Sequence, residues 1–151
     1  MGWKEMLREI EIPPLWLAIF ALAGWGVGRV LPVALPFGRE LGLGLVAIGL
    51  ALMGAAALQM VLRHTTFIPR RDPQALVTSG AFALSRNPIY LGDAFVLAGL
   101  LLIWQAALGL WLVPAFMVFI TRRYIRAEEA MIGAHFGPAY AAYRARTRRW
   151  L

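Results

Sequence analysis

The 151-residue sequence contains no cysteine, which excludes disulfide bonds, thiolate nucleophiles and cysteine-ligated metal sites. Charged residues are scarce, at 15% of the chain, and there are only two histidines. His64 has no second histidine or carboxylate at the spacing of metal ligands, so we expect no metal site. No glycine-rich phosphate-binding loop occurs, and neither Ser79 nor Ser85 has a neighbouring base that would suggest a catalytic triad. The sequence therefore indicates neither a phosphate-loop nucleotide-binding enzyme nor a hydrolase with a catalytic triad.

Apolar residues are abundant instead, at 60% of the sequence. Soluble domains are nearer one half apolar. Four apolar stretches approach or reach the ~18–20 residues that a helix needs to cross a bilayer. The predicted spans are residues 15–35, 41–62, 89–104 and 107–124. We therefore predict a single all-α integral membrane domain over residues 1–151, with about four transmembrane helices.

The basic residues are distributed unevenly around these spans. Thirteen of the fifteen lysines and arginines precede the first span, separate the second from the third, or lie at or beyond the end of the fourth. Only Arg29 and Arg39 fall on the other side. Because cytoplasmic loops are enriched in basic residues, both termini and the long loop are predicted to be cytoplasmic. We attribute the net charge of +7 to basic residues that set the membrane topology and attract anionic lipids, and we expect no nucleic-acid partner.

Two polar stretches interrupt the apolar pattern. Residues 76–93 read LVTSGAFALSRNPIYLGD, and residues 126–143 read RAEEAMIGAHFGPAYAAY. The predicted cytoplasmic motif regions that contain them are residues 74–93 and 126–150. Since the topology places both regions on one side of the membrane, we expect them to fold together into one active site. Backbone amides, a tyrosine and carboxylates would suit a zwitterionic or cationic ligand that also has an apolar part.

The second polar stretch carries two adjacent carboxylates. Glu128 and Glu129 should point about 100° apart on a helix, so at most one is expected to enter a pocket. The other is expected to pair with an arginine at helical spacing, namely Arg122, Arg123 or Arg126. A solvated, ion-paired face remains the alternative for both. Gly137-Pro138 should divide this region into two helices.

Two of the predicted spans have features of their own. Asp93 lies one turn into the third span, and its expected partners are Arg86 and the arginines after Tyr124. The second span has a small-residue face that includes Gly42 and Gly49, which predicts close packing against a neighbouring helix. This face leaves the oligomeric state open.

The two polar stretches, followed by RRW at residues 148–150, resemble the isoprenylcysteine carboxyl methyltransferase family and the related phospholipid methyltransferases. The family pattern is L-V-T-x-G-x-[FY], then R-[HN]-P-x-Y-x-G, then E-E-x-x-L-x-x-x-F-G-x-x-Y-x-x-Y, and the match runs from Leu76 to Trp150. The resemblance implies a membrane-embedded methyltransferase that uses S-adenosyl-L-methionine. It also implies a cytoplasmic C-terminal helical region that encloses the cofactor, a lipophilic acceptor that enters from the bilayer, and the inner membrane of a bacterium.

Carried over position by position, the resemblance implies a cofactor site. The cofactor-binding residues would be Gln74, Ala75, Leu76, Val77, Phe82, Asn87, Pro88, Ile89, Tyr90 and Glu128. Glu129 would be the structural neighbour of the cofactor-binding glutamate. The two predicted catalytic residues are Arg86 and Arg126, either of which would orient an anionic acceptor.

The sequence also departs from the family pattern. Asn87 stands where eukaryotic members have histidine, and Tyr124 stands where they have an arginine that handles the prenylcysteine substrate. The acceptor is therefore left open among a lipophilic acid, a thiol, an amine and a phospholipid. The leading prediction is methyl transfer of the isoprenylcysteine carboxyl methyltransferase kind. The alternatives are phospholipid N-methylation, a non-catalytic membrane scaffold, and a relative of NADPH-dependent reductases.

Overall fold

The computed structural model of the chain describes residues 13–65 and 74–151. These residues are organised into α-helices with short 3-10 and π-helical turns. In chain order they are α2 (Pro13–Val30), α3 (Gly38–Leu62), α4 (Ala81–Leu84), α5 (Pro88–Ile103), the 3-10 turn η1 (Ala107–Gly109), α6 (Leu112–Ile120), the π-helical turn η2 (Thr121–Ile125), α7 (Arg126–Phe136) and α8 (Pro138–Arg146).

Three helical stretches are long and apolar enough to cross a membrane. They are Pro13–Val30, Gly38–Leu62 and Ala107–Phe136, and α5 is a shorter apolar helix of 16 residues. The predicted all-α membrane fold is confirmed. At 1.5 Å per residue, α5 is about 24 Å long, which is less than the ~30 Å hydrocarbon core of a bilayer.

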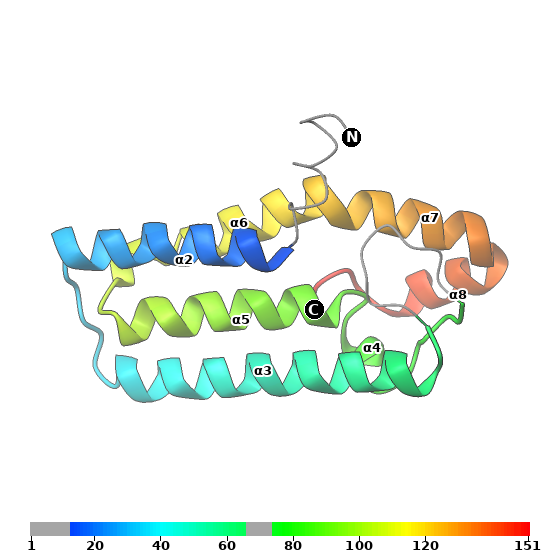
Figure 1. Ribbon diagram of the computed structural model, residues 1–151, viewed down its shortest axis with the longest axis horizontal. Helices are drawn as coiled ribbons and strands as arrows, with labels where there is room; N and C mark the ends of the chain where they lie inside the picture. Colours follow the sequence, from blue (N-terminus) through cyan, green and yellow to red (C-terminus); the bar gives the residue numbers. More distant parts are fainter. Residues whose placement is uncertain (1–12, 66–73) are drawn as a thin grey trace, which may run out of the picture.

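Helix α5 lies in the middle of the molecule, with α3 along one side and α2 and α6 along the other (Figure 1). The connections from α2 to α3 and from α5 to α6 lie together at one end of the bundle. Helices α4 and α8 and the far end of α7 gather at the opposite end. The two polar stretches therefore occupy the same end of the molecule.

Glycines bring α3 and α5 into backbone contact. A Cβ atom added to Gly42 would lie 2.6 Å from the carbonyl oxygen of Gly99, and one added to Gly49 would lie 2.6 Å from that of Gly92. Each pair of glycines is seven residues apart, or about two helical turns, so one face of each helix meets the other in register. The predicted close packing of the second span is confirmed, and its partner is α5 of the same chain.

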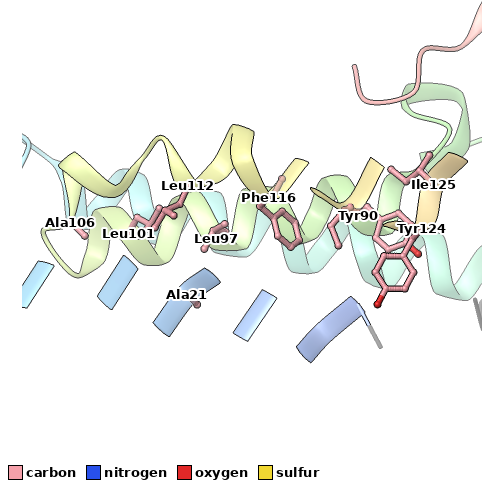
Figure 2. Packing of buried hydrophobic residues seen from close by; sticks show 11 residues of the cluster. Ala21, Tyr90, Leu97, Leu101, Ala106, Leu112, Phe116, Tyr124 and Ile125 are labelled. Carbon is pink, nitrogen blue, oxygen red and sulfur yellow. The ribbon is translucent and has the colours of Figure 1, made fainter. Parts of the chain in front are cut away.

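The hydrophobic core fills the space between α5, α6 and α2 (Figure 2). Leu97 and Leu101 on α5 belong to the same cluster as Phe116 and Ile120 on α6, and all four residues are fully buried. The cluster continues along α5 to Tyr90, at the end of the helix that faces the polar elements. The apolar core and the polar stretches are thus joined through one helix.

Two helices end at least five residues away from the predicted end of their membrane span. Helix α2 ends at Val30, five residues before the predicted boundary at residue 35, because Pro32 disfavours helical geometry at the residue that precedes it. Tyr124 ends no helix, since α6 passes through η2 directly into α7 and continues to Phe136. The predicted break at Gly137-Pro138 is confirmed, with Gly137 at a φ of 49° that a glycine adopts without strain.

Candidate active site

The two polar stretches meet where α5 begins. Pro88 occupies the first turn of α5, and Tyr90 follows on the buried side of the helix. The Tyr90 hydroxyl donates a hydrogen bond of 2.8 Å to Oε1 of Glu128 on α7. Because α6, η2 and α7 form one continuous helical stretch, Glu128 is carried past the end of the apolar core to this position. The predicted meeting of the two stretches is therefore present in the fold.

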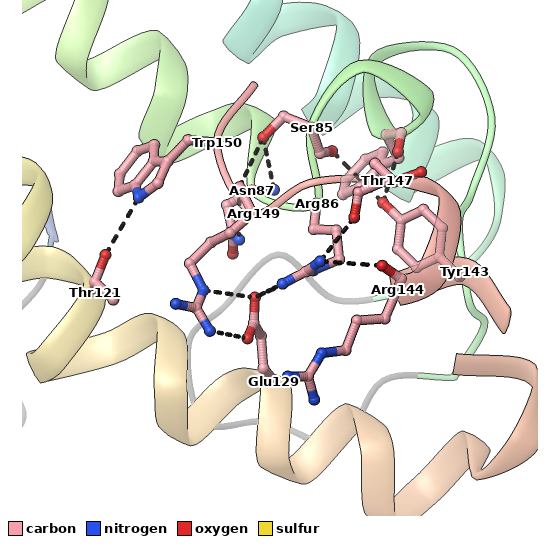
Figure 3. A network of polar contacts seen from close by, with 11 residues as sticks. Ser85, Arg86, Asn87, Thr121, Glu129, Tyr143, Arg144, Thr147, Arg149 and Trp150 are labelled. Carbon is pink, nitrogen blue, oxygen red and sulfur yellow. Dashed lines mark hydrogen bonds and ion pairs between the residues drawn. The ribbon is translucent and has the colours of Figure 1, made fainter. Parts of the chain in front are cut away.

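The adjacent carboxylate, Glu129, lies at the centre of a network of ion pairs (Figure 3). Its Oε1 accepts hydrogen bonds from Arg86 at 3.0 and 3.2 Å, and Arg149 binds both of its oxygens at 3.1 and 2.7 Å. The side chains of Arg86 and Glu129 are only 9% and 10% exposed. The hydrogen bonds that Arg149 donates to Glu129 raise the pKa of the Arg149 guanidinium. Glu129 is ion-paired as expected, but the expected partners on its own helix are wrong.

The partners of Glu129 follow from the path of the last residues of the chain. The segment after α8 runs back to the start of α5, where the Arg149 carbonyl accepts hydrogen bonds from Ser85 Oγ at 3.0 Å and Asn87 Nδ2 at 3.1 Å. The backbone N–H of Arg86 donates to the Arg148 carbonyl at 2.9 Å, and its guanidinium donates to the Thr147 carbonyl at 2.7 Å. Residues 147–149 therefore close over the R-N-P motif.

The glycine-containing loop before α4 is held by two side chains from other helices. Gln59 on α3 accepts a hydrogen bond from the Ala81 N–H at 2.9 Å and donates to the Ser79 carbonyl at 3.2 Å. Tyr143 on α8 donates to the Phe82 carbonyl at 2.6 Å. Burial raises the pKa of Tyr143, which keeps the phenol protonated and able to donate.

The predicted cofactor residues fall into two groups. Asn87, Pro88, Ile89, Tyr90 and Glu128 lie together where α5 meets α7. The others lie on the segment that leads to α4 and in α4 itself: Gln74, Ala75, Leu76, Val77 and Phe82. Val77 is buried, whereas Gln74 is exposed and its N–H donates to Thr65 Oγ1 at 3.1 Å. Their role in cofactor binding remains a prediction.

The two predicted catalytic arginines have different surroundings. Arg86 is largely buried, and its guanidinium is engaged by Glu129 and by backbone carbonyls. Arg126 is exposed on the surface of α7. Their proposed role in orienting an acceptor remains a prediction, and Arg86 has a structural role in addition.

Behind the Tyr90–Glu128 contact lies a buried pair of aromatic side chains. The Tyr124 ring, in the π-helical turn η2, lies 6.4 Å from that of Tyr90, and its hydroxyl accepts a hydrogen bond of 3.1 Å from Trp16 on α2. Single π-helical turns often occur at functional sites. Asp93, three residues after Tyr90, is 2% exposed, and its expected ion pair with Arg86 is absent because Arg86 binds Glu129.

A groove of about 570 Å³ lies between α7 and α8. Its volume is within the range of ligand pockets, but none of the ten predicted cofactor residues lines it. Its lining includes Glu129, Gly133 and Tyr140, and the Tyr140 hydroxyl is buried without a hydrogen-bond partner in the described part of the chain. The site predicted from the two polar stretches is therefore at the Tyr90–Glu128 contact, outside this groove.

Comparison with curated proteins finds no match to this chain. Residues 37–139, more than half of the chain, match the phospholipid methyltransferase family. The matched region extends from the start of α3 to the start of α8 and includes both Tyr90 and Glu128. The helical membrane fold and this match together identify the chain as a member of the phospholipid methyltransferase family, and hence as a membrane methyltransferase.

Proposed function

We propose that this protein transfers a methyl group from S-adenosylmethionine to a lipophilic acceptor held in the membrane. The observation that carries the proposal is the hydrogen bond between Tyr90 and Glu128. It joins the R-N-P-x-Y and E-E motifs at the boundary between the apolar core and the polar end of the molecule. A donor bound on the polar side and an acceptor bound on the apolar side would meet at this boundary.

The residues at this boundary fit the chemistry of the cofactor. When bound, S-adenosylmethionine supplies a methyl group activated by a positively charged sulfur. The Glu128 carboxylate would attract the cationic groups of the methionine part, and the Asn87 amide would bind its polar atoms. Val77, which is buried, and Phe82, which is half-buried, precede Asn87 in the first polar stretch, and both are suited to the adenosyl part. The remaining task of the chain is to align the reactants and to exclude water.

The acceptor is a membrane-partitioned molecule in this proposal. Membership of the phospholipid methyltransferase family favours phospholipid N-methylation over the isoprenylcysteine carboxyl methyltransferase-like reaction. Arg86 would have an indirect role. Its guanidinium binds Glu129 and the Thr147 carbonyl, and these contacts hold the C-terminal segment over Asn87. Arg126 is exposed on α7 and is the arginine left for an anionic group of the acceptor.

The donor site can be tested by calorimetry on detergent-purified protein. S-adenosylmethionine and S-adenosylhomocysteine should bind, and NADPH should not. Replacement of Glu128 by Gln keeps the shape of the side chain and its hydrogen bond from Tyr90 but removes the charge. Hydrogen bonds to charged groups contribute about 1.5–3 kcal/mol, so Glu128→Gln should weaken binding roughly tenfold to a hundredfold.

Glu40→Gln is the matched control, since Glu40 is exposed on the first turn of α3 at the opposite end of the bundle. This variant should bind both adenosyl compounds like the unaltered protein. Equal affinities for the two variants would remove Glu128 from the donor site. No binding of either adenosyl compound by folded protein would favour a non-catalytic scaffold, and binding of NADPH would favour a reductase.

A further inference from the structure

Asp93 is a buried carboxylate that the site described so far does not use. Its side chain is 2% exposed, and it has no hydrogen bond or ion pair to any residue that the structure describes. An isolated charge in an apolar environment is costly, and residues of this kind inside membrane helices are usually functional. Asp93 is therefore suited to a positively charged partner that the described residues do not supply.

The groups around Asp93 in the described part of the chain are tyrosines and a carboxylate, and none of them is a cation paired with it. It lies within electrostatic reach of Tyr90, one helical turn away, and the charge nearest to that tyrosine is the Glu128 carboxylate. Tyr124, in η2, also lies within electrostatic reach of Tyr90, and Arg123 of the same turn lies over the Tyr124 ring, 5.4 Å from its centroid. In the described helices that pack against α5, the other titratable side chains, Arg29, Arg39 and Glu40, lie at the opposite end.

Asp93 lies towards the end of α5 that faces the polar stretches. It is five residues from the start of the helix at Pro88, a rise of about 7.5 Å. Half of a hydrocarbon core is about 15 Å thick, so a group this far along a helix that starts at the membrane surface lies about midway between the surface and the centre. A charged group on a lipid-like molecule could reach it while the acyl chain stays among the apolar helices.

We propose that Asp93 binds the ammonium group of an amine acceptor and takes up the proton that this group must lose before it is methylated. This inference rests on the proposed methyl transfer and names the acceptor as a lipophilic primary amine, whether a phospholipid headgroup or a long-chain amine. An alkylammonium is protonated at neutral pH, as lysine is, and has no lone pair for attack. A carboxylate acceptor would be repelled by Asp93.

The step balances in atoms and charge. One ammonium proton passes to a carboxylate oxygen of Asp93, which leaves a neutral amine and a carboxylic acid. The nitrogen lone pair then forms a bond to the methyl carbon of the sulfonium donor as the carbon–sulfur bond breaks. The bonding electrons remain on sulfur, which becomes a neutral thioether, and the product is an N-methylated ammonium. Asp93 later returns its proton to water.

The test uses the purified protein in detergent with labelled S-adenosylmethionine and four acceptors: dodecylamine, phosphatidylethanolamine, dodecanoic acid and dodecanethiol. Removing a general base typically costs 10²–10⁴-fold, so Asp93→Asn should lower amine methylation at least a hundredfold. Its remaining activity should rise with pH as free amine accumulates. Dodecylamine binding by calorimetry, without the donor, should also weaken at least tenfold in this variant, whereas Glu40→Gln should match the unaltered protein in both assays.

Two further measurements separate this proposal from other roles of Asp93. S-adenosylhomocysteine should bind Asp93→Asn within twofold of the unaltered protein, and the variant should unfold at the same or a higher temperature, because an unpaired buried charge has been removed. A loss of S-adenosylhomocysteine affinity would assign Asp93 to the donor site, and a lower unfolding temperature would make it structural. Either result, or unchanged amine methylation, would overturn the proposal, as would a preference for the acid or the thiol.

The amine arms also separate the two sources of the ammonium group, since only a headgroup site would favour phosphatidylethanolamine over dodecylamine. If the unaltered protein bound no adenosyl compound, the proposed methyl transfer would fail. Dodecylamine binding that depends on Asp93 would then still support the ammonium site, and its absence would remove that site as well.

Discussion

The contact between α3 and α5 makes a quantitative prediction about Gly49. A Cβ atom at this position would lie 2.6 Å from the Gly92 carbonyl oxygen and 3.1 Å from the Val96 backbone nitrogen. Ordinary contacts begin at 3.4 Å, so the carbonyl is 0.8 Å too close. Both neighbouring atoms are backbone and cannot rotate away, so the whole of α5 would have to move.

We expect Gly49→Ala to destabilise the protein by about 1–3 kcal/mol, the usual cost of overpacking a core. Gly44→Ala on the same helix is the matched control, because nothing lies within 4 Å of a Cβ atom at that position. Alanine is favoured over glycine in a helix by about 0.5–1 kcal/mol, so this variant should be neutral or more stable. The free energies of unfolding of the two variants should therefore differ by about 1.5–4 kcal/mol.

The measurement is unfolding in mixed micelles with increasing fractions of a denaturing detergent, followed by circular dichroism of the helices. Equal unfolding free energies for Gly49→Ala and Gly44→Ala would refute the backbone contact. A shift of α5 would also displace Tyr90, so Gly49→Ala should weaken S-adenosylhomocysteine binding, while Gly44→Ala should leave it intact.

Two other predictions concern the polar end of the molecule. Glu129→Gln leaves the buried Arg86 without its counter-charge, so it should destabilise the protein by about 3–5 kcal/mol in the same micelle assay. A decrease in unfolding free energy below about 1 kcal/mol would mean that the ion pairs of Glu129 with Arg86 and Arg149 contribute little to stability. Tyr143→Phe removes the hydrogen bond to the Phe82 carbonyl and should cost about 0.5–1.5 kcal/mol. Because the pKa of Tyr143 is raised in the folded state, this contribution is complete below pH 10 and is lost as the pH rises further, so unfolding curves of both proteins should converge at alkaline pH. A constant difference across that range would contradict the assignment.

Much of the fold follows from local features of the sequence. Long apolar stretches predict the membrane helices, the glycines of the second span predict its close packing, and Gly137-Pro138 predicts the break between α7 and α8. The distribution of arginines predicts that the two polar stretches share one side, and the Tyr90–Glu128 contact agrees with this. In each case the residues that carry the information lie close together in the sequence.

The parts that could not be predicted depend on contacts between distant residues. Glu129 was expected to pair along its own helix, but Arg86 and Arg149 are 43 and 20 residues away in sequence. Their approach requires the last residues of the chain to fold back onto α5, and no helical periodicity encodes that path. The helix continues beyond Tyr124, the predicted end of the fourth span, because the change from apolar to polar residues marks a membrane boundary and not a helix end.

The arrangement of charges also bears on which acceptors the protein can use. An anionic acceptor would need a free cation near Tyr90, but Arg86 is 9% exposed and already binds Glu129 and the Thr147 carbonyl. To release it would expose a buried carboxylate without its partner, which is strongly unfavourable. Asp93, in contrast, has no partner in the described residues and gains one when a cation arrives. The balance at this boundary therefore favours positively charged ligands, a sulfonium donor and an ammonium acceptor, over a carboxylate.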